Sequence, residues 1–198
     1  MQRLITILLF LSPAIINAQF RIGVKAGVNF ANVTNASAIK ASSRNGYMIG
    51  GYISPKAKKT LSFRSEIILS RQGYDYKTNT NTGNVNLDYL LLPQLITLNF
   101  SKLIQLHVGG QAAFLLNANV DSTGNGNGSL FDYFNRFDYG VVAGGEIYPF
   151  MGFFIGARIN ASLNNVNKEA PQGGGWPNFI PRIDAKNNVV QVYVGWRL

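Results

Sequence analysis

Hydrophobic and polar residues alternate along much of the chain. Between residues 20 and 30 the even positions are apolar, from Phe20 through Val24 to Phe30, and the odd positions carry Arg21, Lys25 and small or polar residues. A period of two sustained over this length predicts a β-strand with one apolar face. The same alternation recurs at residues 61–70, 104–116, 137–147, 151–163 and 189–198.

Two further segments alternate less regularly. Residues 46–54 have apolar side chains on both faces, and residues 85–100 are apolar at odd positions up to Leu91 but at even positions from Ile96. Pro93 lies at this change of phase, and proline cannot donate a ladder hydrogen bond, so the pattern predicts a β-bulge near Pro93. The total is eight strands, with the in/out phase near Met48 and Pro93 left open.

The connections between these strands alternate in length. Long ones fall at 31–45, 73–84, 117–135 and 164–188, and short ones at 55–60, 101–103 and 148–150. An up-and-down meander with short turns at one end and long loops at the other is typical of bacterial outer-membrane barrels. An even number of strands returns both termini to the short-turn end, which we expect to face the periplasm.

The polar face decides between a membrane barrel and a soluble ligand-binding calyx. It consists largely of small residues such as Gly23, Gly109, Gly140 and Ser162, whereas a water-exposed outer face would be rich in Lys, Glu and Thr. Aromatic residues gather near both ends of the apolar faces, where a membrane barrel has its interfacial girdles. We therefore predict an all-β fold, an eight-stranded antiparallel up-and-down transmembrane β-barrel in the outer membrane of a Gram-negative bacterium. A soluble calyx is the alternative.

The first residues resemble an export signal. A basic start at Arg3 is followed by an apolar run from Leu4 to Ile16 and by Ala18, a small residue where a signal peptidase could cut. The run is shorter than the roughly 20 residues of a membrane-spanning helix. We expect residues 1–18 to be a cleaved signal peptide and residues 19–198 to form a single outer-membrane β-barrel domain.

Composition narrows the chemistry. Charged residues make up 14% of the chain, against about 25% in ordinary soluble domains. The chain has no cysteine, which excludes disulfides, thiolate metal sites and thiol nucleophiles. The formal net charge of +9 comes from scattered basic residues without an aromatic and basic binding face, so nucleic acid is not an expected partner. Outer-membrane lipid is an expected partner.

Six polar residues fall on the predicted lumen face: Lys25, Arg64, Glu66, His107, Glu146 and Arg158. An eight-stranded barrel is only wide enough for side chains to fill it, so we expect these groups to form ion pairs and hydrogen bonds that plug the interior. A gated ion path is the alternative. His107 is the only histidine, so neither a metal site nor a cofactor is predicted, and no spacing singles out a nucleophile for a Ser–His–Asp triad. We expect His107 to form lumen hydrogen bonds.

Two loop features point to partners. The long loops carry aromatic residues that could form an interaction patch: Phe131, Tyr133, Phe134, Trp176 and Phe179. The short connection 55–60 holds Lys56, Lys58 and Lys59 and could touch anionic headgroups or a periplasmic protein. A solvated basic turn is the alternative interpretation of that connection.

The chain resembles the PorT-like outer-membrane β-barrel family of Bacteroidetes. The segments that carry the resemblance are FRIGVKAGVNFANV, LSFRSEIILSRQGYDY, DYLLLPQLITLNF, FDYGVVAGGEIYPF, GARINASLNNV and VVQVYVGWRL. The resemblance implies an accessory component of a protein-secretion apparatus that acts through partner contacts.

Three functions are therefore open at this point. The first is a non-enzymatic barrel with a side-chain-filled lumen that anchors long external loops for structural or binding roles at the cell surface. The second is the secretion role that the resemblance implies. The third is a barrel enzyme acting on envelope lipid. Fold alone does not choose among them.

Overall fold

The computed structural model describes residues 20–34, 40–55, 60–77, 82–122, 128–129, 131–168 and 186–198. The predicted signal peptide and the basic residues of the 55–60 connection lie outside these residues. Within the described part of the chain, no helix is both long and apolar enough to cross a membrane.

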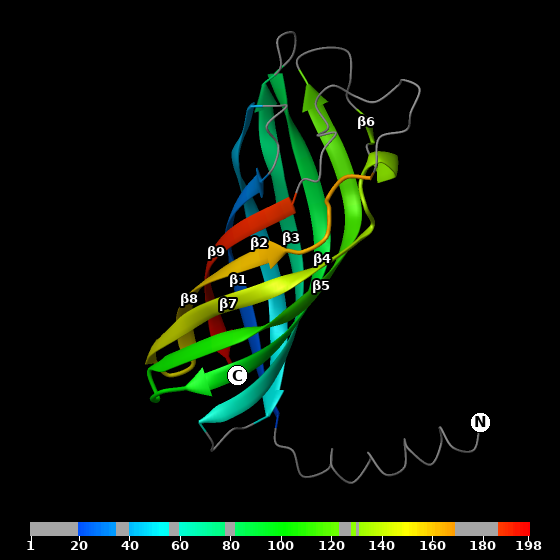
Figure 1. The fold of residues 1–198 in the computed structure, drawn as a ribbon. Helices are drawn as coiled ribbons and strands as arrows, with labels where there is room; N and C mark the ends of the chain where they lie inside the picture. Colours follow the sequence, from blue (N-terminus) through cyan, green and yellow to red (C-terminus); the bar gives the residue numbers. More distant parts are fainter. Residues whose placement is uncertain are drawn as a thin grey trace, which may run out of the picture.

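Eight long antiparallel strands form a closed barrel (Figure 1). They are β1 (Phe20–Thr34), β2 (Lys40–Pro55), β3 (Leu61–Lys77), β4 (Thr82–Asn99), β5 (Ile104–Ser122), β7 (Phe137–Phe150), β8 (Phe153–Ser162) and β9 (Lys186–Arg197). A two-residue strand, β6 (Gly128–Ser129), pairs with β5, and a 3-10 turn covers Phe131–Tyr133. β1 pairs with β9, so the sheet has closed on itself. The predicted eight-stranded antiparallel barrel is confirmed.

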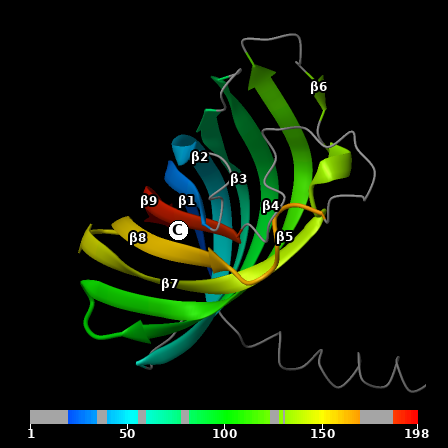
Figure 2. The ribbon, with the colours of Figure 1, turned by 45° about the horizontal axis from the view of Figure 1, so that its top comes forward.

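The barrel is taller on one side than on the other. β3, β4 and β5 rise beyond β7, β8 and β9 at the long-loop end, which is at the top of Figure 1 and comes forward in Figure 2. Parts of the predicted loops 31–45, 73–84 and 117–135 are therefore strand: β2 begins at Lys40, β3 continues to Lys77 and β5 to Ser122. These extensions are rich in Asn, Ser and Gly, which made them look like loops in the sequence.

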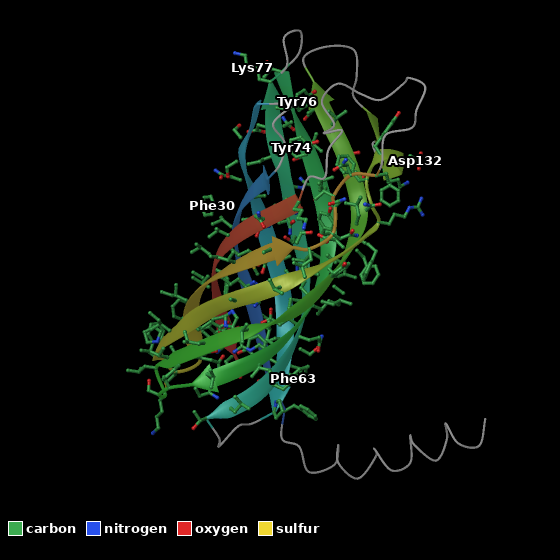
Figure 3. The ribbon with its side chains drawn as sticks, viewed as in Figure 1. Phe30, Phe63, Tyr74, Tyr76, Lys77 and Asp132 are labelled. Atoms are coloured by element: carbon green, nitrogen blue, oxygen red, sulfur yellow. The ribbon has the colours of Figure 1, made fainter. Side chains whose placement is uncertain are left out.

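An apolar belt surrounds the lower and middle parts of the barrel. In Figure 3, Phe63 lies near the short-turn end and Phe30 near the upper limit of this belt. Leu61–Leu69 on β3 spans nine positions, which matches the 9–11 residues that a tilted strand needs to cross a bilayer. The outward side chains of the belt include Phe20, Ile22, Val24, Val28, Phe30, Ile67, Leu106, Val108, Val141, Ile155, Val192 and Trp196, all at least 41% exposed.

The polarity of the sheet reverses above the belt. There the outward positions are polar, and the buried inward ones are Tyr74, Tyr76, Val85, Leu87, Ala118 and Val120. We call this part the head: residues 40–45, 71–77, 82–88 and 117–122. An apolar interior beneath a polar exterior is the arrangement of a protein in water, whereas the belt below has the opposite arrangement.

This reversal corrects the predicted bulge at Pro93. Odd positions of β4 point inward from Val85 to Thr97, and the register with β3 is continuous through Pro93. The apolar residues change face along β4, but the strand itself does not slip. The irregularity lies in β5, whose register with β4 shifts between Asp88 and Tyr89, leaving Leu116 as the extra residue.

The phase near Met48 is now defined. Met48 points inward, while Tyr47 and Ile49 point outward at 51% and 55% exposure. The pairing of β2 with β3 shifts between Ser43 and Met48, so this irregularity also falls where the belt meets the head.

Glycines opposite large aromatic residues make the lower core compact. The register places Gly23 opposite Tyr52, Gly156 opposite Tyr193 and Gly195 opposite Phe154. A Cβ atom at Gly156 would lie 2.5 Å from the Tyr193 ring, and one at Gly23 would lie 2.3 Å from the Tyr52 ring. These glycines therefore provide the space in which the rings lie across the lumen.

Candidate functional site

The six polar residues that were predicted to face the lumen all point into the barrel. Lys25 comes from β1, Arg64 and Glu66 from β3, His107 from β5, Glu146 from β7 and Arg158 from β8, and each is at most 3% exposed. Their strands deliver them inward because every second residue faces the lumen. The structure brings five of them into one cluster, which we call the ion-pair layer: Lys25, Arg64, Glu66, Glu146 and Arg158.

Glu66 is the centre of the ion-pair layer. Its Oε2 accepts hydrogen bonds from Lys25 Nζ at 2.7 Å and from Arg158 Nη1 at 2.6 Å. Arg64 Nη1 lies 3.7 Å from its Oε1. One carboxylate therefore stabilises cations from β1 and β8 and approaches a third on its own strand, although these strands are far apart in sequence.

Glu146 forms the second anionic position. Arg64 Nη1 donates to its Oε1 at 2.7 Å, and the hydroxyls of Tyr148 and Tyr193 donate to its two oxygens at 2.6 Å and 3.0 Å. The Arg64 guanidinium also stacks over the Tyr52 ring, 4.1 Å from its centroid. Both carboxylate oxygens are thus hydrogen-bonded without access to water.

A chain of amides continues from the ion-pair layer toward the head. Arg158 Nε donates to Gln191 Oε1 at 2.6 Å, and Gln191 Nε2 donates to Asn29 Oδ1 at 2.7 Å. Asn29 Nδ2 then donates to Ser70 Oγ at 2.9 Å. Four residues of this network were not among the predicted site residues: Gln191, Asn29, Tyr148 and Tyr193. Their inward-facing positions in the alternation could have identified them.

This arrangement fills the lumen. Three cations face two carboxylates, and the aromatic rings of Tyr52, Tyr148, Phe154 and Tyr193 occupy the space around them. Breaking a buried pair would leave an uncompensated charge, so these contacts resist separation. The ion-pair layer therefore cross-links β1, β3, β7 and β8.

His107 differs from expectation. It is 3% exposed and points into the lumen, but neither ring nitrogen has a hydrogen-bond partner among the described residues. The described residues thus supply no partner for the expected hydrogen bonds of His107, and that role stays a prediction. His107 lies opposite Thr97 on β4 and Gly144 on β7 in the sheet. The described residues contain no group of three or more His, Cys, Asp or Glu side chains that could hold a metal ion.

The predicted loop patch is only partly a surface. Phe134 is fully buried in the apolar cluster that includes the inward residues of the head, and Phe131 and Tyr133 pack against the same cluster. Backbone hydrogen bonds from Asn135 to Val166 and from Lys168 to Tyr133 hold residues 131–136 against 163–168. These aromatic residues cover the open inner face of the head, so Phe134 is not available to a partner. Trp176 and Phe179 lie outside the described residues.

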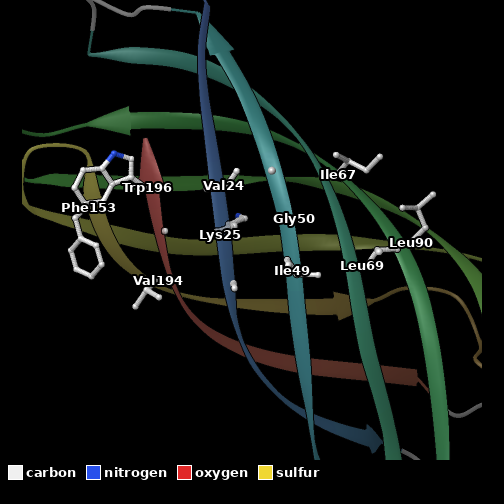
Figure 4. Close-up of a pocket in the computed structure, with 13 residues that line it drawn as sticks. Val24, Lys25, Ile49, Gly50, Ile67, Leu69, Leu90, Phe153, Val194 and Trp196 are labelled. Carbon is white, nitrogen blue, oxygen red and sulfur yellow. The ribbon is translucent and has the colours of Figure 1, made fainter. Parts of the chain in front are cut away.

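The outer face carries a shallow apolar hollow across β9, β1, β2 and β3, shown in Figure 4. The small residues Ala26 and Gly51 form its floor, and Val24, Ile49, Ile67 and Trp196 are among the side chains around it. It lies entirely within the apolar belt, so we interpret it as lipid-facing surface rather than as a site for a soluble ligand.

A closed antiparallel barrel with an apolar belt and a filled polar interior is a transmembrane β-barrel of the bacterial outer membrane. The chain belongs to the family described as outer membrane protein beta-barrel domain, whose model matches residues 14–168. It is similar to Ail, the attachment invasion locus protein of Yersinia pestis (14% identity, TM-score 0.52, covering 90% of this chain and 98% of that one). Neisserial surface protein A is similar at 14% identity and TM-score 0.52, covering 89% and 96%. No curated protein sequence matches.

Proposed function

We propose that this protein is a non-enzymatic outer-membrane barrel that holds its head and long loops above the outer surface of the cell for a structural or binding role. The observation that carries the proposal is the reversal of polarity above the belt. A sheet with an apolar interior and a polar exterior is stable in water. The simplest explanation of the reversal is therefore that the upper strands lie in water outside the membrane.

The outer face of the head supports the same proposal. Arg44 Nη1 pairs with Asp75 at 2.6 Å, and Arg71 forms two hydrogen bonds with Asp88 at 2.7 Å and 3.0 Å. These pairs lie on neighbouring strands at partly exposed positions, where water and lipid headgroups can reach them. At roughly 3.3 Å per residue, Arg71–Lys77 adds roughly 20 Å of strand beyond the belt.

The filled lumen argues against a role in solute transport. Solutes would have to displace the ion-pair layer, which joins β1, β3, β7 and β8 through charged hydrogen bonds. The interior of an eight-stranded barrel is only about wide enough for its side chains, which leaves no open channel for solutes. We therefore place the function on the head and loops, not in the interior.

Orientation is tested by cysteine labelling, because the chain has no native cysteine. Lys77→Cys at the top of β3 and Lys102→Cys in the short turn before β5 are both exposed and form a matched pair. On intact cells, a membrane-impermeant maleimide should label Lys77→Cys, and should label Lys102→Cys only after the outer membrane is permeabilised. Labelling of Lys102→Cys alone on intact cells would place the head in the periplasm and refute the proposal.

The secretion role implied by the PorT-like resemblance stays a prediction. No contact in the described residues favours it over surface anchoring. Deletion of the gene followed by quantification of secreted proteins addresses it directly, since unchanged secretion eliminates that role.

A further inference from the structure

A second polar region lies in the upper lumen, where the belt meets the head. It is a small cavity, with room for about one water-sized occupant. Its polar lining comes from six different strands and comprises Gln72, Tyr89, Gln111, Asp138, Asn160, Ser162 and Asn187. The ion-pair layer contributes no residue to it.

Several polar atoms around this cavity lack hydrogen-bond partners. The Tyr89 hydroxyl, Gln111 Oε1, Asn187 Oδ1 and both amide atoms of Asn160 form no hydrogen bond with the described residues. Tyr89, Asn160 and Asn187 are 2%, 4% and 5% exposed, so bulk water does not satisfy them. Buried polar groups are nearly always paired, and several unpaired ones around one cavity indicate an occupant.

The available atoms are mainly oxygen acceptors. The Asn187 amide nitrogen donates to Gln72, which leaves its Oδ1 as an acceptor only. Asp138 is 7% exposed and accepts a hydrogen bond from the Ser162 hydroxyl at 2.6 Å. No ion pair among the described residues includes Asp138. The cavity therefore combines a carboxylate that lacks an opposite charge with amide and hydroxyl oxygens.

We propose that this cavity binds a single monovalent metal cation, Na⁺ or K⁺, held by the Asp138 carboxylate and the oxygens of Gln111, Asn160, Asn187 and Tyr89. One positive charge balances the one carboxylate, whereas calcium sites recruit more carboxylates around a larger set of oxygens. A water molecule would satisfy hydrogen bonds but would supply no charge opposite to the Asp138 carboxylate. The ion would join β7, β8 and β9 to β4 and β5 at the base of the head.

The test is the thermal unfolding of the refolded full-length protein in detergent at constant ionic strength. Chloride salts of Na⁺ or K⁺ replace the chloride salt of N-methyl-D-glucamine, a cation too large for the cavity. The expected result is a Tm that rises with the concentration of Na⁺ or K⁺ and then saturates, as for a ligand that binds only the folded state. Crystals soaked in Rb⁺ or Tl⁺ should show an anomalous peak in the cavity.

Asp138→Asn should abolish both the Tm response and the anomalous peak, and Asp132→Asn, at an exposed position nearby, should keep both. Gln111→Met provides a second variant that removes one acceptor and leaves the Asp138–Ser162 contact in place, and it should weaken the response. An equal Tm in all three salts, a response to Ca²⁺ alone, or a cavity holding only water would overturn the proposal.

Discussion

At the scale of single residues, Glu66 has the most cationic neighbours among the carboxylates of the described residues. It accepts hydrogen bonds from Lys25 on β1 and from Arg158 on β8, the strand that lies opposite β3 in the barrel, and all three side chains are sealed from water. Alternation along the strands was enough to predict that these charges face inward. Their pairing was not predictable, because it depends on strand tilt and stagger, which bring β1, β3 and β8 to one level of the lumen.

Replacing Glu66 by Gln should lower the free energy of unfolding by roughly 3–5 kcal/mol, because Lys25 and Arg158 would keep their charges without a carboxylate. Urea unfolding of the refolded protein in detergent measures the change. Asp88→Asn is the matched control, since its pair with Arg71 is partly exposed and should be worth less than about 1 kcal/mol. Equal losses in the two variants would mean that the ion-pair layer is accessible to water.

The double variant Lys25→Met/Glu66→Gln removes one charge of each sign from the ion-pair layer. It should recover part of the stability that Glu66→Gln loses, because the net charge of the layer returns to its original value. The same urea experiment gives the coupling free energy between the two side chains. Additive losses would show that Lys25 and Glu66 do not act as a pair.

Gly156→Val should prevent folding, because the new side chain would occupy the space of the Tyr193 ring, 2.5 Å from the position of the added Cβ. Heat-modifiable migration on a gel separates folded from unfolded barrel. The control is Ala157→Val, one residue along β8 and facing lipid. A folded Gly156→Val barrel would show that the aromatic residues of the lumen can rearrange.

At the scale of elements, the strands and their faces could be predicted from the sequence where they cross lipid, but not above the belt. Within the belt, an apolar residue faces outward, so parity alone assigns each face. Above the belt the same strands keep their parity while the apolar residues move to the other face, as Val85 and Leu87 do on β4. In the sequence, the change of surroundings from lipid to water thus resembles a β-bulge, and the polar outward positions above the belt resemble a loop.

Leu87→Ala should loosen the head and leave the barrel intact. Leu87 is fully buried in the interior of the head. Removing its side chain leaves a cavity that should lower the stability of the head by about 2–5 kcal/mol. Hydrogen exchange should show faster exchange in the upper parts of β3, β4 and β5, with unchanged protection in the belt. Leu98→Ala, at a lipid-facing position on the same strand, should leave the head unaffected. A loss of protection throughout the barrel would show that head and belt unfold as one unit.

At the scale of the whole molecule, the barrel divides into a lipid-facing belt with a plugged interior and a water-facing head. Planar-bilayer recordings of the refolded protein should therefore show no steady conductance, because the ion-pair layer and four aromatic rings fill the interior among the described residues. A porin of about 16 strands, reconstituted in the same way, gives the open-channel reference. Steady conductance by this protein would mean that the layer opens in the membrane, and the function would then have to be sought in the lumen instead of on the head.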